Sequence, residues 1–323
     1  MFFSLIVSVY NRPDEVRELL KSIEKQIFDR QKISFEVLVV EDGSTLKAEE
    51  VIKDFAQNLN IRYFFKENTG QGFSRNYAFK YARGDYFIIL DSDCLLPPNY
   101  LQNIYNHLQH TPLDAFGGPD TAHESFTDTQ KAINYAITSL FSTGGVRGNK
   151  YSVEKFRPRS FNMGISRKVW ETIGGFALTR MGEDIEFSIR IEKAGFRIGL
   201  IPDAFVYHKR RKNFKEFYKQ LHSFGRTRID LWRLHPDEFK FVHCLPALFV
   251  LFLFSIPFVF LLNTRVGILM ISALGLYLGL IFIDALFKTK NLKISAMASW
   301  AVLVQLTAYG IGFLTEIFQP TKR

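Results

Sequence analysis

Cysteine is nearly absent from this sequence. The 323 residues include only Cys94 and Cys244, which lie far apart and show no metal-ligand spacing. The sequence therefore excludes a disulfide-rich secreted scaffold and a cysteine-bound structural zinc site. Two isolated thiols are typical of a protein kept in a reducing compartment.

Charge is missing from one long stretch near the C-terminus. From Phe241 to Phe287 only Arg265 and Asp284 carry a formal charge, whereas the preceding residues mix both signs. About twenty apolar residues cross a bilayer core, and the segments 241–262 and 266–287 each reach that length. The sequence predicts a transmembrane region over 241–318 that follows an N-terminal domain over 1–235.

A third apolar segment, 294–318, differs from the other two because it contains Gln305 and Glu316. It is either a third crossing or a re-entrant or interfacial helix. Asp284 is costly near a bilayer centre, but it lies close to the end of its segment, where an acid can reach water. Two or three helices are too few to enclose a polysaccharide channel within one chain, so we expect a membrane anchor.

The N-terminus lacks the basic start, long apolar core and small-residue cleavage site of a signal peptide. It is better explained as a first strand. The excess of positive charge, +9 overall, is concentrated next to the apolar region. The segment from Phe205 to His235 contains nine Lys or Arg but only two acidic residues. This placement indicates anionic membrane lipid and a cytoplasmic orientation, and no nucleic-acid motif accompanies it.

Strand-like and helix-like segments alternate through the first hundred residues. Apolar runs at 3–9, 35–40, 61–65 and 86–90 are separated by helical spacing, beginning with Val16, Leu19, Leu20, Ile23 and Ile27. This alternation predicts an α/β domain with a mostly parallel sheet, whose ligands bind at the carboxyl ends of the strands.

Acidic residues stand at two of those strand ends. Asp42 follows one apolar run, and Asp91 and Asp93 follow another. Side chains two apart on an extended chain share a face, so Asp91 and Asp93 could hold Mg²⁺ or Mn²⁺ together with a nucleotide diphosphate. A solvated turn is the simpler explanation of these residues alone. A third strand end leads through Asn68 and Gly70 into a helix with Arg75, and there the glycines favour either a bound anion or an ordinary turn.

Several segments together resemble the nucleotide-sugar motifs of family 2 glycosyltransferases, which have the GT-A fold. They are residues 8–12, 40–44, 68–76 and 91–93, followed by 161–164, 174–176 and 182–184. The resemblance covers about residues 3–235 in the right order. It implies that Asp42 contacts the donor base and that Asp91 and Asp93 are the metal-binding DXD pair. Further donor contacts implied by it are Ser8, Tyr10, Asn11, Asn68, Gly70 and Arg75.

The same resemblance implies catalytic and acceptor residues in the second half. Glu183 and Asp184 match the motif that carries the catalytic base, and we assign the base to Asp184, with Glu183 as a supporting or acceptor contact. Neighbouring residues on a helix point about 100° apart, so one acid of the pair should face the site. The alternative is a pair of acids favoured by a helix N-terminus. Asn162, Met163 and Gly164 resemble the acceptor-side strand.

His208 is the candidate third metal ligand, since some family members place a histidine after this helix; a structural histidine is equally compatible with the sequence. An imidazole ligand suits Mn²⁺ better than Mg²⁺. After it, residues 213–235 combine apolar positions at helical spacing with basic residues, which predicts an amphipathic helix on the membrane surface or one packed on the catalytic domain. The Gln-x-x-Arg-Trp motif of processive relatives such as cellulose synthase is absent.

These features predict a membrane-anchored, metal-dependent inverting glycosyltransferase with its catalytic domain on the cytoplasmic side of a bacterial-type inner membrane. Its partners would be a nucleotide diphosphate sugar, preferably a UDP-sugar, and a lipid-linked saccharide or polyprenol carrier. Two alternatives remain: a polyprenyl-phosphate glycosyltransferase, and a catalytically silent scaffold that binds a nucleotide sugar. The sequence leaves the sugar, the acceptor and the oligomeric state open.

Overall fold

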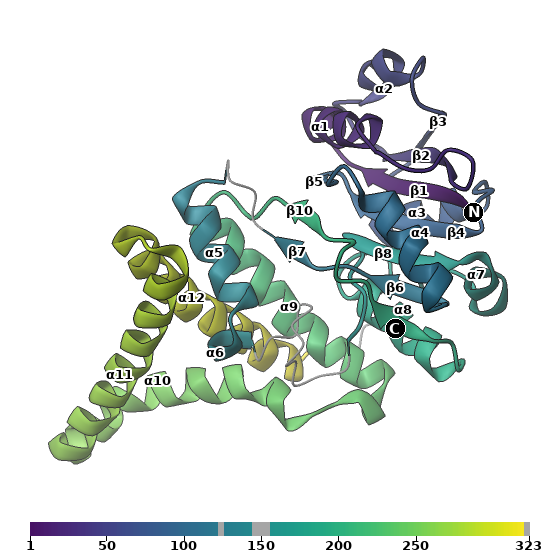
Figure 1. Cartoon of the computed structure of the whole chain (residues 1–323). Helices are drawn as coiled ribbons and strands as arrows, with labels where there is room; N and C mark the ends of the chain where they lie inside the picture. Colours follow the sequence, from purple (N-terminus) through teal and green to yellow (C-terminus); the bar gives the residue numbers. More distant parts are fainter. Residues whose placement is uncertain (122–125, 144–155, 320–323) are drawn as a thin grey trace. The chain divides into compact units, whose positions relative to one another are not determined.

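The computed structural model describes residues 1–121, 126–143 and 156–319 (Figure 1). Its contacts divide the chain into two compact units. The first contains Met1–His123 and Arg147–Lys209, and the second contains Glu124–Val146 and Arg210–Arg323. The contacts therefore group the basic helix after residue 213 with the apolar helices, and they add to this second unit a segment from the middle of the N-terminal region.

The first unit opens with the expected alternation of strands and helices. The elements are β1 (Phe2–Val9), α1 (Pro13–Glu24), β2 (Ser34–Asp42), α2 (Glu49–Phe55), β3 (Ile61–Lys66), α3 (Gln71–Phe79) and β4 (Tyr86–Asp91). The four strands are parallel, in the order β3-β2-β1-β4. Ile27, expected on the first helix, lies beyond its end and is 65% exposed.

The second half of this unit completes a mixed sheet. Its elements are β5 (Cys94–Leu95), α4 (Tyr100–His110), β6 (Ala115–Gly117), β7 (Asp120–Thr121), β8 (Asn162–Ser166), α7 (Arg167–Ile173), α8 (Glu183–Lys193), β9 (Ile198–Leu200) and β10 (Val206–His208). In the described ranges, seven strands form one sheet in the order β3-β2-β1-β4-β8-β6-β9. Only β8 runs antiparallel to its neighbours in this sheet, so the predicted mostly parallel sheet is confirmed.

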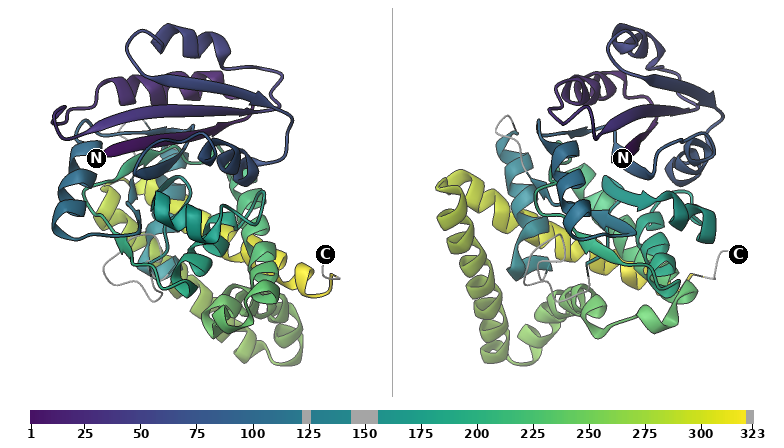
Figure 2. Two further views of the ribbon diagram at one scale, coloured as in Figure 1. Left: turned by 90° about the vertical axis from the view of Figure 1, so that its right-hand side faces the viewer. Right: turned by 45° about the vertical axis from the view of Figure 1, so that its right-hand side comes forward.

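Both faces of the sheet are covered, which explains why its central strands are mostly apolar. Side chains alternate along β1, with Leu5 and Val7 in one apolar cluster and Ile6 in the other. Helices α1, α2 and α4 contribute to the first cluster, and α3, α7 and α8 to the second. Figure 2 shows helices on both faces of the N-terminal strands.

The second unit consists of helices. They are α5 (Asp128–Thr138), α6 (Leu140–Thr143), α9 (Phe214–Leu234), α10 (Leu245–Leu262), α11 (Thr264–Thr289) and α12 (Leu292–Ile317), with short 3₁₀ turns at Pro236–Glu238 and Phe241–Cys244. Figure 1 shows α10 and α11 meeting at an angle near their shared turn. Among the described helices, three are long and apolar enough to cross a membrane: Phe241–Leu262, Thr264–Thr289 and Leu292–Ile317.

The third of these helices differs from the others in its surroundings. In the most apolar part of α12 half of the residues are buried by other parts of the protein, against 11% in each of the first two. α9 packs along α12, and α5 also lies against it. The apolar positions of the predicted amphipathic helix, such as Phe217 and Leu221, are therefore turned toward neighbouring helices of the same unit.

Acids within the apolar helices have partners. Glu316 is 1% exposed, and one of its oxygens accepts a hydrogen bond from Arg226 Nε on α9 at 2.5 Å. Asp284 accepts hydrogen bonds from Tyr135 Oη at 2.5 Å and Lys288 Nζ at 2.8 Å. The cost of placing each acid in an apolar helix is thus reduced by a donor from the protein itself.

The crossing of α9 and α12 gives a stability prediction. A Cβ at Gly225 would lie 2.0 Å from Tyr309 O, so Gly225→Ala should force the two backbones apart and destabilise this unit by about 1–3 kcal/mol. The matched control is Gly275→Ala in α11, where a Cβ would meet nothing within 4 Å. Thermal unfolding of the detergent-solubilised protein measures both. Equal melting temperatures for the two variants would contradict the prediction.

Candidate functional site

The carboxyl ends of the parallel strands bring the predicted donor residues to one edge of the sheet. Ser8 on β1 pairs with Asp91 on β4, and its neighbour Val9 pairs with Glu41 on β2. Asp42, Asp91 and the loop after β3 therefore end at the same edge, as the rule for open α/β sheets requires. This is where the sequence places a nucleotide.

Asp42 is the anchor of the loop that follows β3. Its carboxylate accepts hydrogen bonds from Lys66 Nζ at 2.5 Å and from the backbone N–H groups of Thr69 and Gly70, each at 2.9 Å. Burial alone would raise the pKa of Asp42, but the hydrogen bonds from Lys66 and Thr69 outweigh it and lower the pKa. Gly70 has φ +92°, a backbone conformation that favours glycine. Asp42 thus stays ionised and fixes the loop.

Arg75 lies at the centre of the site and is fully buried. Its Nη2 donates to Asp91 Oδ1 at 2.7 Å and its Nη1 to Glu183 Oε1 at 2.9 Å. Burial opposes the charged form, yet Asp91 and Glu183 raise the pKa of the guanidinium above its ordinary value. No part of Arg75 is exposed, and both of its terminal nitrogens are bonded to these acids, so its predicted contact with the donor stays a prediction.

The two acids at the start of α8 have different surroundings. Glu183 is 2% exposed, and its Oε1 accepts hydrogen bonds from Gln71, Arg75 and Ser160. Burial, and then the charge of Asp184, raise the pKa of Glu183 to about 7. Asp184 is half-buried and accepts from the backbone N–H groups of Ser160 and Ile185 at 3.3 and 2.8 Å. Asp184 is therefore the acid of the pair that retains access to a ligand.

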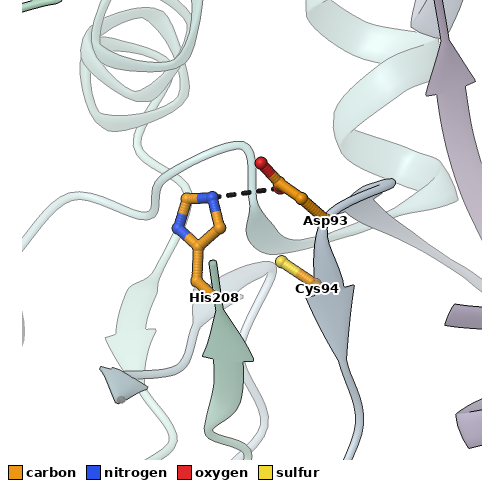
Figure 3. A group of neighbouring side chains, drawn as sticks. All are labelled: Asp93, Cys94 and His208. Carbon is orange, nitrogen blue, oxygen red and sulfur yellow. Dashed lines mark ion pairs between the residues drawn. The ribbon is translucent and has the colours of Figure 1, made fainter. Parts of the chain in front are cut away.

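Asp93 and His208 meet where β10 pairs with β5. Their ligand atoms, His208 Nε2 and Asp93 Oδ1, lie 3.2 Å apart (Figure 3). Cys94 lies beside them, and the three residues offer ligand atoms within 4.8 Å of one another. Cys94 is a poor ligand, however, because burial and the nearby Asp93 raise the pKa of its thiol well above the ordinary value. Its Sγ donates to Phe161 O at 3.4 Å.

The side chains of Asp91, Asp93 and His208 fit a divalent cation. Asp93 and His208 converge, and Asp91 is the more exposed acid of the DXD pair, with 32% of its side chain accessible. Oxygen ligands combined with one imidazole suit Mn²⁺. Asp93 Oδ2 also lies 3.3 Å from Arg12 Nη1, so the guanidinium of Arg12 forms an ion pair with this carboxylate.

The remaining residues predicted to contact the donor differ in exposure and in hydrogen bonding. Tyr10 is 52% exposed and free to contact a ligand. Asn11 instead supports the neighbouring loop: it adopts φ +56°, and its Oδ1 accepts from the backbone N–H groups of Thr45 and Leu46. Asn68 donates a hydrogen bond from Nδ2 to Asp42 O and accepts one from Arg180 Nη2. Asn11 and Asn68 shape the site through the loops that they hold.

The predicted acceptor-side residues lie at the start of β8. Asn162 is 1% exposed and uses its side chain within the protein, accepting from Tyr100 Oη at 2.6 Å and donating to Ala204 O at 2.7 Å. Met163 is fully buried, and a Cβ at Gly164 would lie 2.0 Å from the Phe116 ring. These residues lie on an interior strand between β4 and β6, and their contact with an acceptor stays a prediction.

The structure adds residues that sequence reasoning missed. Lys66 and Gln71 bind Asp42 and Glu183, respectively, and Asp120 lies beside His208, with its Oδ2 3.7 Å from Nδ1. Lys66 ends β3, so the strand-end argument could have found it. Asp120 could not be found in this way, because β7 is only two residues long and no apolar run precedes it.

The sequence matches a known family of enzymes. The family model for glycosyl transferase family 2 matches residues 4–181. The glycosyltransferase AglE of Haloferax volcanii is 25% identical over 265 residues, which cover 77% of this chain and 80% of AglE. The minor teichoic acid biosynthesis protein GgaB of Bacillus subtilis is 36% identical over 251 residues, covering 73% of this chain but only 27% of GgaB.

A solved structure shares the fold. The mannosyltransferase PcManGT from Pyrobaculum calidifontis, solved with GDP-Man and Mn²⁺, has a TM-score of 0.59 at 17% identity, covering 98% of this chain and 87% of PcManGT. The GT-A fold expected from the sequence is thereby confirmed. Since the family model spans the strand-end motifs from β1 to the loop before α8, this chain belongs to glycosyl transferase family 2.

Proposed function

We propose that this glycosyltransferase is membrane-anchored and metal-dependent, and that it transfers a sugar with inversion from a nucleotide diphosphate sugar to a lipid-linked saccharide or polyprenol carrier. The observation that carries the proposal is the difference in burial between Glu183 and Asp184. Glu183 is buried against Arg75, whereas its neighbour Asp184 is only partly buried. One accessible acid is the requirement for a single base that activates one acceptor hydroxyl.

The reaction needs two things from this chain. Asp184 would accept the proton of the attacking hydroxyl, and attack from the face opposite the leaving diphosphate gives inversion. Asp91, Asp93 and His208 would hold a divalent cation, which when bound supplies positive charge for the departing diphosphate. Arg75 would hold the carboxylates of Asp91 and Glu183 in fixed positions relative to one another, since it donates a hydrogen bond to each from a fully buried position.

The membrane role is supported by α10 and α11, whose apolar side chains are largely uncovered by protein. The nucleotide sugar donor is supported by the family and by PcManGT, which was solved with GDP-Man. The relative GgaB, named for teichoic acid biosynthesis, supports a role in the synthesis of a cell-surface polysaccharide. A UDP-sugar remains our preferred donor. A lipid-linked acceptor follows from the pairing of a glycosyltransferase domain with an anchor, at a cytoplasmic membrane face.

A donor screen tests this function. Detergent-solubilised protein and lipid-extract acceptors are incubated with UDP-sugars and GDP-mannose, with Mn²⁺ and with EDTA, and release of nucleotide diphosphate is measured. We expect one donor to be turned over in Mn²⁺ and the rate to fall to background in EDTA. Binding of a donor without turnover of any would favour a silent scaffold, and undiminished turnover in EDTA would remove the metal from the proposal.

A further inference from the structure

A small second sheet places one histidine between two acids. β10 lies between β5 and β7 in this sheet. It pairs antiparallel with β5, so that His208 faces Cys94, the residue after Asp93, and it pairs parallel with β7, so that Val206 faces Asp120. Asp93 and Asp120 thereby approach His208 from two separate strands.

The geometry assigns a different ring nitrogen to each acid. His208 Nε2 lies 3.2 Å from Asp93 Oδ1, and Nδ1 lies 3.7 Å from Asp120 Oδ2. The ring is also stacked on Phe161, with centroids 4.7 Å apart and an angle of 27° between the planes. Asp120 and Phe161 are 7% and 8% exposed, so both contacts belong to the interior of the protein. Together they restrict how the imidazole can turn.

We propose that Asp120 is a positioning residue for the metal site: it holds the proton of His208 on Nδ1 and so leaves the Nε2 lone pair for the cation. The inference rests on the proposed metal dependence. Asp93 lies closer to the ring, 3.2 Å from Nε2, but in the proposed site it would bind the cation together with that nitrogen. The buried Asp120 then favours an N–H on Nδ1 electrostatically, even at 3.7 Å, because only 15% of the His208 side chain is exposed to water. Fixing the tautomer and the ring orientation keeps the other nitrogen available to the cation.

Removal of this carboxylate tests the inference. Mn²⁺ affinity of the full-length protein in detergent is measured by the loss of the free-ion signal in electron paramagnetic resonance, without donor. Asp120→Asn should weaken Mn²⁺ binding by about 10-fold or more, the usual effect of losing a carboxylate that orients a histidine ligand. The matched control is Asp114→Asn at the opposite end of β6, where the carboxylate accepts from Arg197 N. It should leave Mn²⁺ affinity unchanged.

A measurement on the unaltered protein covers the case in which Asp120→Asn fails to fold. Pulsed electron paramagnetic resonance detects an imidazole nitrogen bound to Mn²⁺, and we expect this signal in the wild type and its loss in His208→Gln. Absence of bound nitrogen in the wild type, or equal Mn²⁺ affinity in wild type and Asp120→Asn, overturns the inference while the proposed function survives. Failure of the wild type to bind Mn²⁺ at all overturns the proposed metal dependence instead.

Discussion

Replacing Asp184 by asparagine is expected to lower kcat for sugar transfer by about 10²–10⁴-fold, the usual contribution of a general base. Asparagine has nearly the same shape but cannot accept the proton of an acceptor hydroxyl. Donor affinity should persist, because Asp91 and Arg75 keep their contacts with one another. Initial rates of nucleotide diphosphate release, with donor binding measured separately by calorimetry, provide the test.

The controls for Asp184 separate the base from general effects of charge. Asp203 is exposed on the loop before β10, and Asp203→Asn should retain the wild-type rate. A rate for Asp184→Asn within a few-fold of the wild type would remove the base assignment. If the variant loses transfer to a hydroxyl acceptor but keeps transfer to a bare polyprenyl phosphate, the polyprenyl-phosphate glycosyltransferase becomes the better description, since a phosphate acceptor has little need of a base.

The second large effect is expected at Arg75. Arg75→Met removes the cation between Asp91 and Glu183 and leaves Glu183 buried without its charged partner. Breaking a buried pair in this way costs about 3–5 kcal/mol, which corresponds to a fall in melting temperature of about 10 °C. The matched control is Arg17→Met, because Arg17 pairs with Asp54 at the surface, where such pairs contribute about 0–1 kcal/mol.

A conservative change at Arg75 distinguishes shape from charge. Lysine keeps the positive charge but has no planar fork, so it cannot donate to Asp91 and Glu183 in the same arrangement. We expect Arg75→Lys to recover part of the melting temperature and little of the activity. Wild-type stability in Arg75→Met, measured by thermal unfolding in detergent, would show that the two acids do not depend on this cation.

The alternating pattern of the first ninety residues was sufficient to predict the parallel half of the sheet. Strands β1, β2 and β4 are buried on both faces, so their sequences are mostly apolar, and Asp42 and Asp91 mark the ends of β2 and β4. The predicted association of Asp93 with His208 is present in the geometry. The ends of buried strands can be predicted from the sequence because an ionisable residue is costly to bury without a partner, so it tends to stand where the buried strand ends.

Other parts of the site depend on contacts that a sequence pattern does not encode. The family resemblance predicts that Arg75 contacts the donor, but it does not predict the burial of Arg75 between Asp91 and Glu183. That burial depends on how α3 and α8 pack. Asp120 became visible only through the pairing of two short strands. Hydropathy likewise identified α12 but could not distinguish lipid from protein as its surroundings, because both accept apolar side chains.

The position of α5 in the chain has a consequence for biosynthesis. α5 precedes β8 in sequence, yet its apolar residues Ala132, Ile133 and Ala136 pack in one cluster with α12, which begins only at Leu292. During translation this apolar surface leaves the ribosome long before its partner has been made, and exposed surface of that kind promotes aggregation. A catalytic fragment ending before α9 would keep it uncovered permanently. We therefore expect such a fragment to aggregate unless the C-terminal helices are present.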